Sequence, residues 1–376
     1  MKDILFYYPQ HFNRTKNATN PFFDKMLEIC DRHKIEYDLF EEPDSSTDKP
    51  RNPKAKKSDK FFWMVTVFRK LVTMFMPRKD FFYKERYVAS LINIFTLGRY
   101  RRKVYITISG SMYHLFSYLN PKADVYDMQH GVLYKHHPTF FDSETLRLKS
   151  QFYRPNLHMI FWGKGYRDCF VKGEEAHMRG KAHVLGYPVD LLSDNIESNI
   201  RDNSGKNEIV VSLQFTHSVC YEELEKMKRT LCSFLEQTSM LSVKVLLKHH
   251  PRYNNSINID DLVDRFDNVE ITDLSFEELL DRVSLHVTYF STTAFEFAQY
   301  GIPTFFLPYE DKKLNQTLYY DEYNYPLYLN NTIGGVVTRL TDSGAYKEDS
   351  ETVKKWYLKF YSPFDEKEFI KLIRRG

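Results

Sequence analysis

Residues 285–308 read LHVTYFSTTAFEFAQYGIPTFFLP and decide the fold of the chain. The apolar run 285–290 predicts a strand, the hydroxyl residues 291–293 a polar turn, and the apolar spacing of 294–298 a helix that ends at Gly301. After Pro303, a second apolar run at 304–307 predicts another strand. Strand, helix and strand in this order form the unit from which parallel sheets are built.

The first turn of this helix is the candidate functional end of the unit. Backbone N–H groups at a helix start have no partners within the helix, so that this end favours an anion such as phosphate. Ser291 can also act as an ordinary N-cap. Followed by Glu296 and Gly301, the triplet Ser291, Thr292 and Thr293 resembles the nucleotide-binding unit of glycosyltransferases with the GT-B fold. The resemblance implies that the hydroxyls hold the donor phosphates and that Glu296 holds the ribose.

Length and composition predict a two-domain globular protein. A chain of 376 residues exceeds one compact core of usual size, and 42% hydrophobic with 27% charged residues is typical of a folded soluble protein. The net charge of +3 is too small to indicate nucleic acid as a partner. The four cysteines include no close pair, which argues against a disulfide framework or a zinc site. Because the apolar part of the N-terminus is too short for a signal peptide, we expect a cytoplasmic protein.

The stretch 61–76, FFWMVTVFRKLVTMFM, is very apolar but carries Arg69 and Lys70 at its middle. These charges and the short length argue against a membrane-spanning helix. Two interpretations stay open. One is a buried helix, and the other is a basic-flanked element that rests on an anionic membrane surface, which would place the protein at the inner face of the membrane.

Strands and helices alternate through the first half of the chain and restart after a polar stretch at 193–207. The α/β pattern therefore predicts two Rossmann-like domains, and resemblance to GT-B proteins implies that they face each other across a cleft. We expect an acceptor-side domain over 1–192, a linker over 193–207 and a nucleotide-donor domain over 208–350. The GT-B resemblance also implies that the helical segment 351–376 returns to the first domain.

Lys248 and His250 follow a predicted strand in the second half, at the end where open α/β folds bind ligands. His250 with Pro251 resembles the His-Pro motif of bacterial sialyltransferases and related capsule enzymes, in which the histidine contacts the donor phosphate. Those families also have a Ser/Thr motif at a later helix start. Gln214, at the end of the first strand after the linker, would face the same site.

Candidate catalytic residues lie at the end of a first-half strand. An imidazole group ordinarily titrates near neutral pH, which makes His130 the candidate base for an acceptor hydroxyl. Asp127 could orient a histidine or serve as the base itself. Gly186 and Tyr187, followed by a proline, resemble the Gly-x-Pro that borders the nucleotide in related enzymes.

No metal site is expected. The spacing of His130, His136, His137 and His250 lacks a metal-ligand pattern, and no Asp-x-Asp motif follows a strand.

The resemblance implies a metal-independent glycosyltransferase of bacterial surface-polysaccharide synthesis, with a CMP-sugar favoured over a UDP-sugar as donor and a glycan or lipid-linked acceptor. The nucleotide-sugar is a substrate, so no cofactor is expected. A CDP-polyol phosphotransferase of the teichoic acid type and a UDP-sugar 2-epimerase are the alternatives.

Overall fold

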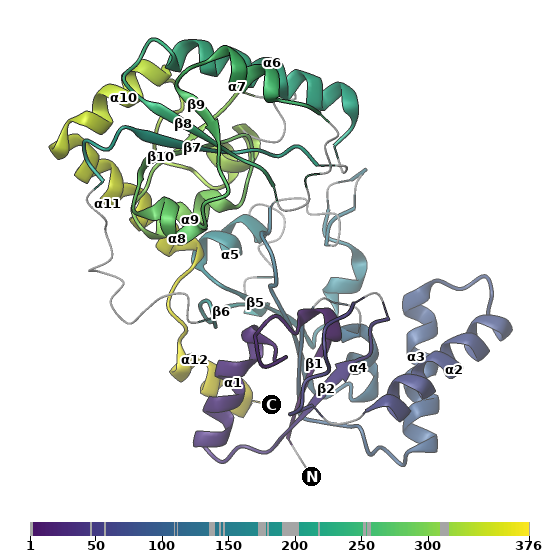
Figure 1. The fold of residues 1–376 in the computed structure, drawn as a ribbon. Coiled ribbons are helices and arrows are strands. Elements are labelled where there is room, and N and C mark those ends of the chain that lie inside the picture. Colours follow the sequence, from purple (N-terminus) through teal and green to yellow (C-terminus); the bar gives the residue numbers. More distant parts are fainter. Residues whose placement is uncertain are drawn as a thin grey trace. The chain divides into compact units, whose positions relative to one another are not determined.

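The computed structural model describes residues 3–375 except 46, 56–57, 109, 111, 135–139, 143, 146, 172–177, 179, 190–202, 217–218, 251–252, 254–256 and 309–315. The chain forms two compact units, unit 1 (Met1–Leu192 with Phe360–Gly376) and unit 2 (Ser193–Lys359). Each unit is built on one parallel sheet with helices around it (Figure 1). Most of the predicted linker, 193–202, lies outside the described residues.

Unit 1 has a six-stranded sheet in the order β2-β1-β3-β4-β5-β6. Its strands are β1 (Ile4–Pro9), β2 (Tyr37–Glu42), β3 (Val104–Ile108), β4 (Asp124–Met128), β5 (Leu157–Phe161) and β6 (Ala182–Val184). Its helices are α1 (Pro21–Arg32), α2 (Asp59–Phe75), α3 (Phe81–Phe95), α4 (Tyr113–Leu119), α5 (Lys164–Phe170) and α12 (Glu366–Arg375), with short 3-10 turns at Gln10–Phe12 and Ser150–Tyr153. The strand order reverses between β1 and β3.

Unit 2 has a five-stranded sheet in the order β11-β10-β7-β8-β9. Its strands are β7 (Glu208–Ser212), β8 (Lys244–Lys248), β9 (Val269–Ile271), β10 (Val283–Thr288) and β11 (Thr304–Phe306). Its helices are α6 (Tyr221–Thr238), α7 (Asp260–Arg265), α8 (Phe276–Leu280), α9 (Thr293–Gln299), α10 (Ile333–Thr341) and α11 (Ser343–Phe360), with a π-helical turn at Gln316–Glu322. This is the Rossmann strand order, and it reverses between β7 and β10.

The core of unit 2 has two layers, one on each face of the sheet. Alternate strand residues such as Ile209 and Val211 pack with α6, α7 and α10, whereas Val210 and Leu246 pack with α8 and α9. Because both faces are covered, the central residues of β7 and β8 are apolar on both sides of the sheet. This explains why the sequence shows them as continuous apolar runs.

Local sequence signals fix the helix ends. Asn20 caps α1 by accepting a hydrogen bond from the N–H of Phe22 at 2.9 Å, and Pro21 takes the first helical position. Ser275 and Glu278 form a capping box at the start of α8, in which each side chain accepts a hydrogen bond from the backbone N–H of the other residue.

The C-terminal segment after α11 runs along unit 1. The N–H of Ser362 donates to the carbonyl of Trp162 at 3.1 Å, and that of Asp365 donates to Leu185 at 2.7 Å. Helix α12 then buries Phe369 and Leu372. The last residues of the chain therefore complete the core of unit 1.

Candidate functional site

The carboxyl ends of three neighbouring strands in unit 2 are in register. Thr288 on β10 pairs with Ser212 on β7, and Ser212 pairs with Lys248 on β8. Because neighbouring strands lie about 4.8 Å apart, the segments that follow these residues leave the sheet within about 10 Å of one another. The reversal of strand order falls between β7 and β10, and open α/β sheets bind ligands at such a point.

A buried polar network joins these strands to the start of α9. The Nε2 atom of His286 lies 2.9 Å from the Ser212 hydroxyl and 3.2 Å from that of Thr293, while its Nδ1 atom lies 3.0 Å from the Thr304 hydroxyl. The imidazole is completely buried and stacks on Phe297, and burial lowers the pKa of His286 to about 3. A neutral imidazole therefore fixes the first turn of α9 against two strands.

The three predicted hydroxyl residues have different environments. The Thr293 hydroxyl donates to the Ser291 hydroxyl oxygen at 2.8 Å, and the carbonyl of Ser291 accepts from the Tyr319 hydroxyl at 2.6 Å. Thr292 takes the N-cap position without a side-chain cap hydrogen bond and is exposed. Glu296 is also exposed. Ser291 and Thr293 thus hold the turn together, whereas the side chains of Thr292 and Glu296 are accessible at the surface.

The residues after β7 and β8 lie at the same edge of the sheet. The ammonium group of Lys248 donates to the carbonyl of Leu274, so it is engaged with the loop before α8. His250 is partly exposed, Gln214 is buried, and Pro251 lies outside the described residues. The structure therefore places His250 and Gln214 on segments that leave the sheet beside the start of α9.

No role for His249 was predicted from the sequence. Its ring stacks on Tyr253 with centroids 3.9 Å apart, and burial lowers the pKa of His249. Its Nδ1 atom is buried and has no hydrogen-bond partner among the described residues. Because such an atom costs free energy when left unpaired, His249 joins His250 as a candidate for ligand contact.

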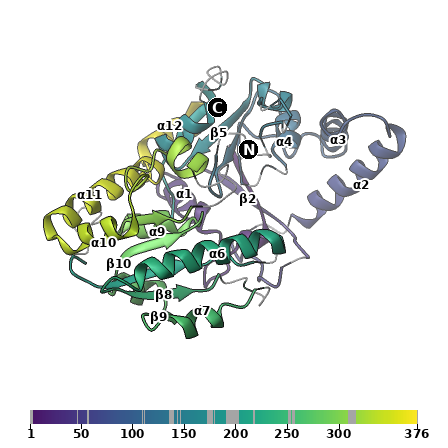
Figure 2. The ribbon, with the colours of Figure 1, turned by 90° about the horizontal axis from the view of Figure 1, so that it is seen from above.

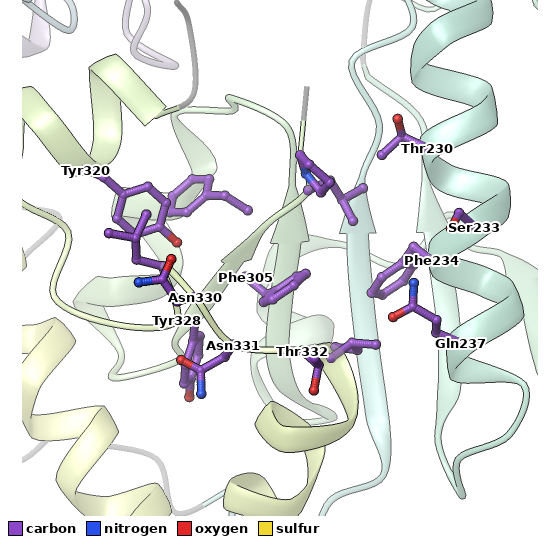
Figure 3. Close-up of a pocket in the computed structure, with 15 residues that line it drawn as sticks. Thr230, Ser233, Phe234, Gln237, Phe305, Tyr320, Tyr328, Asn330, Asn331 and Thr332 are labelled. Atoms are coloured by element: carbon purple, nitrogen blue, oxygen red, sulfur yellow. The ribbon is translucent and has the colours of Figure 1, made fainter. Parts of the chain in front are cut away.

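A cavity of about 540 Å³ lies beside β11 in unit 2 (Figure 3). Aromatic rings, amides and hydroxyls from α6, β11 and the segment 328–333 line it, and Phe234 and Phe305 stack within it with centroids 6.4 Å apart. None of its fifteen lining residues is charged. The cavity offers no counter-charge for phosphates, so it does not replace the strand-end site as the candidate for a nucleotide.

Asp127 of unit 1 is buried at the end of β4. Its Oδ1 atom accepts from the Thr107 hydroxyl at 2.8 Å and from the N–H of Gly110 at 3.1 Å. Gly110 has a φ of +69°, and a Cβ there would lie 3.4 Å from the other carboxylate oxygen. Burial raises the pKa of Asp127 to about 7, and the two hydrogen bonds only partly offset this effect. The carboxyl group therefore titrates in the range that suits acid–base catalysis.

His130 differs from Asp127 in its exposure. It is exposed, and its ring meets the edge of Phe12 with centroids 5.4 Å apart. The neighbouring Gln129 is buried, donates to the carbonyl of Gly131 at 2.8 Å and accepts from the N–H of Trp162 at 3.1 Å. Gln129 thus shapes the turn that presents His130. The side chain of His130 is therefore accessible at the surface, whereas that of Asp127 is not.

Gly186 and Tyr187 contact the returning C-terminal segment. Gly186 has a φ of +85°, and a Cβ there would lie 2.1 Å from the carbonyl oxygen of Pro363. The N–H of Tyr187 donates to Ser362 at 2.8 Å, and its ring packs on Trp162 with centroids 4.8 Å apart. These contacts give both residues a role in holding the chain end to unit 1. Their predicted role beside a nucleotide stays a prediction.

Within the described part of the chain, no group of three His, Cys, Asp or Glu side chains is placed to hold a metal ion. His136 and His137 lie outside that part. None of the four cysteines, all of which the structure describes, forms a disulfide.

Comparison with known proteins bears on the fold. No family model and no curated protein matches the chain. The solved UDP-GlcNAc 2-epimerase of Methanocaldococcus jannaschii aligns with a TM-score of 0.53 at 10% identity, covering 100% of both chains. The wall teichoic acid polymerase TagF, in its H444N variant, aligns with a TM-score of 0.46 at 13% identity, covering 100% of this chain and 88% of the other. For the glycosyltransferase SnogD from Streptomyces nogalater the TM-score is 0.46 at 10% identity, covering 100% of this chain and 99% of the other.

At such identities the likeness concerns the fold alone. The two parallel sheets and the likeness to the epimerase confirm the predicted class, an α/β protein of the GT-B type with two Rossmann-like units.

Proposed function

We propose that the chain is a glycosyltransferase of the GT-B type, which moves a sugar from a nucleotide donor to a glycan or lipid-linked acceptor in surface-polysaccharide synthesis. One observation carries the proposal. The segments that bear the predicted donor-binding residues leave the sheet of unit 2 together, from strand ends that are in register at the reversal of strand order.

In the proposed donor complex, Thr292 and His250 contact the phosphate and Glu296 contacts the ribose. Thr292 and Glu296 are exposed and His250 partly so, which leaves their side chains accessible to a nucleotide. The His-Pro and Ser/Thr motifs favour a CMP-sugar, with a UDP-sugar as the next candidate. Ser291 and Thr293 act by holding the turn in shape, since their hydroxyls bond to each other.

The proposed reaction transfers the sugar without a covalent enzyme intermediate. The acceptor hydroxyl attacks the anomeric carbon, its proton passes to His130 or Asp127, and the bond from that carbon to the donor phosphate breaks. The nucleotide leaves with the electron pair of that bond. Hydrogen-bond donors that already surround the phosphate would stabilise the negative charge that develops on the leaving nucleotide, as in other enzymes that bind a leaving anion.

Nucleotide binding is the first test. Thermal unfolding is measured with CMP, CDP, UDP and GDP, and we expect one of them to raise the unfolding temperature, because a ligand that binds only the folded state stabilises it. Thr292→Ala should weaken that binding roughly ten-fold, the usual effect of removing one hydrogen bond to a charged group. Thr338→Ala, at an exposed position on α10, is the matched control and should bind as the wild type does.

If the wild type, Thr292→Ala and His250→Ala bind the nucleotide equally well, the proposed donor site is wrong. Product analysis then separates the related reactions. A sugar transferred without the donor phosphate supports the proposal, a product that retains the phosphate indicates a phosphotransferase, and donor conversion without acceptor indicates an epimerase.

A further inference from the structure

Exposed apolar side chains gather on helices α2 and α3. Nine of the fifteen large hydrophobic residues that are exposed in the described chain lie between positions 63 and 97. They are Trp63, Leu71, Met74, Phe75, Phe81, Tyr83, Ile94, Phe95 and Leu97. Such a concentration marks an interaction surface, since soluble proteins rarely expose large contiguous apolar patches.

The two helices form a hairpin at the edge of unit 1 (Figures 1 and 2). On α2, Trp63, Leu71 and Met74 share one helical face, while Phe61 and Val65 are buried on the opposite side. Ile94 and Phe95 are exposed at the end of α3, and the ring of Phe95 lies 5.3 Å from that of Phe68 on α2. We call the exposed residues Trp63, Leu71, Met74, Ile94 and Phe95 the hairpin surface.

Leu97 is the most exposed of the nine residues, at 94%, and its backbone has a φ of +52°. A leucine in the left-handed region costs roughly 1 kcal/mol, and its exposed side chain gains no burial in the isolated chain. This position is therefore unfavourable unless something covers the side chain.

Positive charge accompanies the apolar surface. Residues 60–103 contain eleven Lys and Arg against two Asp and Glu, a net charge of +9, whereas the whole chain has +3. Both acidic residues are used locally: Asp80 caps α3, and the buried Glu85 pairs with Arg69. The exposed cations of this region include Lys70, Arg78 and Lys79. The rest of the chain is net negative, so the charge is specific to the hairpin region.

The hairpin is held firmly on its inner side. Arg69 makes two hydrogen bonds of 2.8 Å to the buried carboxylate of Glu85, which ties α2 to α3. Phe61 and Phe62 pack on Phe40 of the sheet. Arg69 thus points inward and Lys70 outward, which explains the two charges in the middle of the apolar stretch. The hairpin surface is a preformed feature of unit 1.

We infer that the hairpin surface docks on an anionic lipid bilayer. The apolar side chains enter the headgroup boundary while the flanking cations contact lipid phosphates, as in amphipathic helices that lie in the membrane plane. No helix in the described residues is long and apolar enough to span a bilayer, so the contact is peripheral. A second copy of the chain fits this face less well, because it would bring the same excess of positive charge.

Vesicle binding by the full chain tests the inference. We expect co-sedimentation with phosphatidylglycerol vesicles, weaker binding to phosphatidylcholine vesicles, and loss of binding between about 0.1 and about 0.5 M NaCl because salt screens the charges. Trp63 is a built-in reporter, since it is 67% exposed while Trp162 and Trp356 are 4% and 1% exposed. Its emission should shift to the blue on binding, and Trp63→Phe should abolish that shift.

Matched variants separate the apolar and electrostatic parts. Met74→Ser should lower the vesicle partition coefficient roughly ten-fold, while Met240→Ser, on an exposed methionine of unit 2, should leave it unchanged. Lys70→Glu should lower binding to anionic vesicles by a similar factor, with Lys347→Glu as its control. All four positions are exposed, so the variants should fold.

Three outcomes would overturn the inference: no binding to anionic vesicles, equal effects of Met74→Ser and Met240→Ser, or a lipid-free dimer that Met74→Ser dissociates. The assay contains neither donor nor acceptor. Membrane docking and the proposed transferase activity can therefore fail independently.

Discussion

At the scale of single residues, the burial of Asp127 leads to a prediction about how the free energy of unfolding depends on pH. Its pKa is about 7 in the folded chain, against 3.8 for a free carboxyl group. Between these values the unfolded chain releases the proton while the folded chain keeps it, so the free energy of unfolding from this group falls as pH rises from about 4 to about 7. Asp127→Asn removes this contribution. Its stability relative to wild type should rise across that window by on the order of a few kcal/mol.

Urea unfolding at pH 4, 5.5 and 8 measures this difference. Asp48→Asn, at an exposed position of the same unit, is the control. If Asp127→Asn changes stability by the same amount at every pH, the carboxyl group is not held protonated by burial.

His286 shows where sequence reasoning stops at this scale. The strand that contains it could be predicted, because apolar residues surround it. Its partners could not, since Ser212 lies 74 residues away in the chain and comes close only through the pairing of β7 with β10. The sequence signal for such a buried network is a polar residue, here His286, within an apolar run. The hydroxyl triplet was recognised from the sequence, but the division between the internal Thr293 and the exposed Thr292 needed the structure.

At the scale of elements, strands and helices were predictable and their order in space was not. The strand predicted at 285–290 overlaps β10, the helix predicted at 294–298 lies within α9, and the strand predicted at 304–307 contains β11. The helices α7 and α10 were not predicted, because segments of six and nine residues offer few turns over which a helical period can be seen. Continuous apolar runs reveal buried strands, but they contain no information about which strands are neighbours. The reversals of strand order, which place the candidate site, came from the structure alone.

At this scale we predict the effect of replacing Gly186, which contacts the C-terminal segment. A Cβ there would overlap the carbonyl oxygen of Pro363, and the φ of +85° already disfavours any side chain. Gly186→Ala should therefore displace the C-terminal segment and destabilise unit 1 by at least about 2 kcal/mol. Gly205→Ala is the matched control, because its φ is +74° but nothing lies within 4 Å of the added atom.

Limited proteolysis followed by mass spectrometry reads out the result. We expect Gly186→Ala to be cut near residues 361–365 faster than wild type, and Gly205→Ala to be cut at the wild-type rate. Equal protection of all three proteins would mean that the segment tolerates the shift.

At the scale of the molecule, the division into two units implies that their stabilities can be changed separately. The segment 361–375 belongs to unit 1, where α12 buries Phe369, Leu372 and Ile373. Burying each such side chain stabilises by about 1.5–3 kcal/mol, so removal of residues 361–376 should lower the stability of unit 1 by several kcal/mol. Unit 2 keeps its own core and its sheet.

Tryptophan fluorescence can separate the two responses, because Trp162 lies in unit 1 and Trp356 in unit 2, both buried. In a background with Trp63→Phe, one set of proteins retains only Trp162 and the other only Trp356. Truncation should move the Trp162 unfolding midpoint to lower urea concentration and leave the Trp356 midpoint in place. A joint shift of both would show that the units unfold as one, since neither sheet could then lose stability without the other.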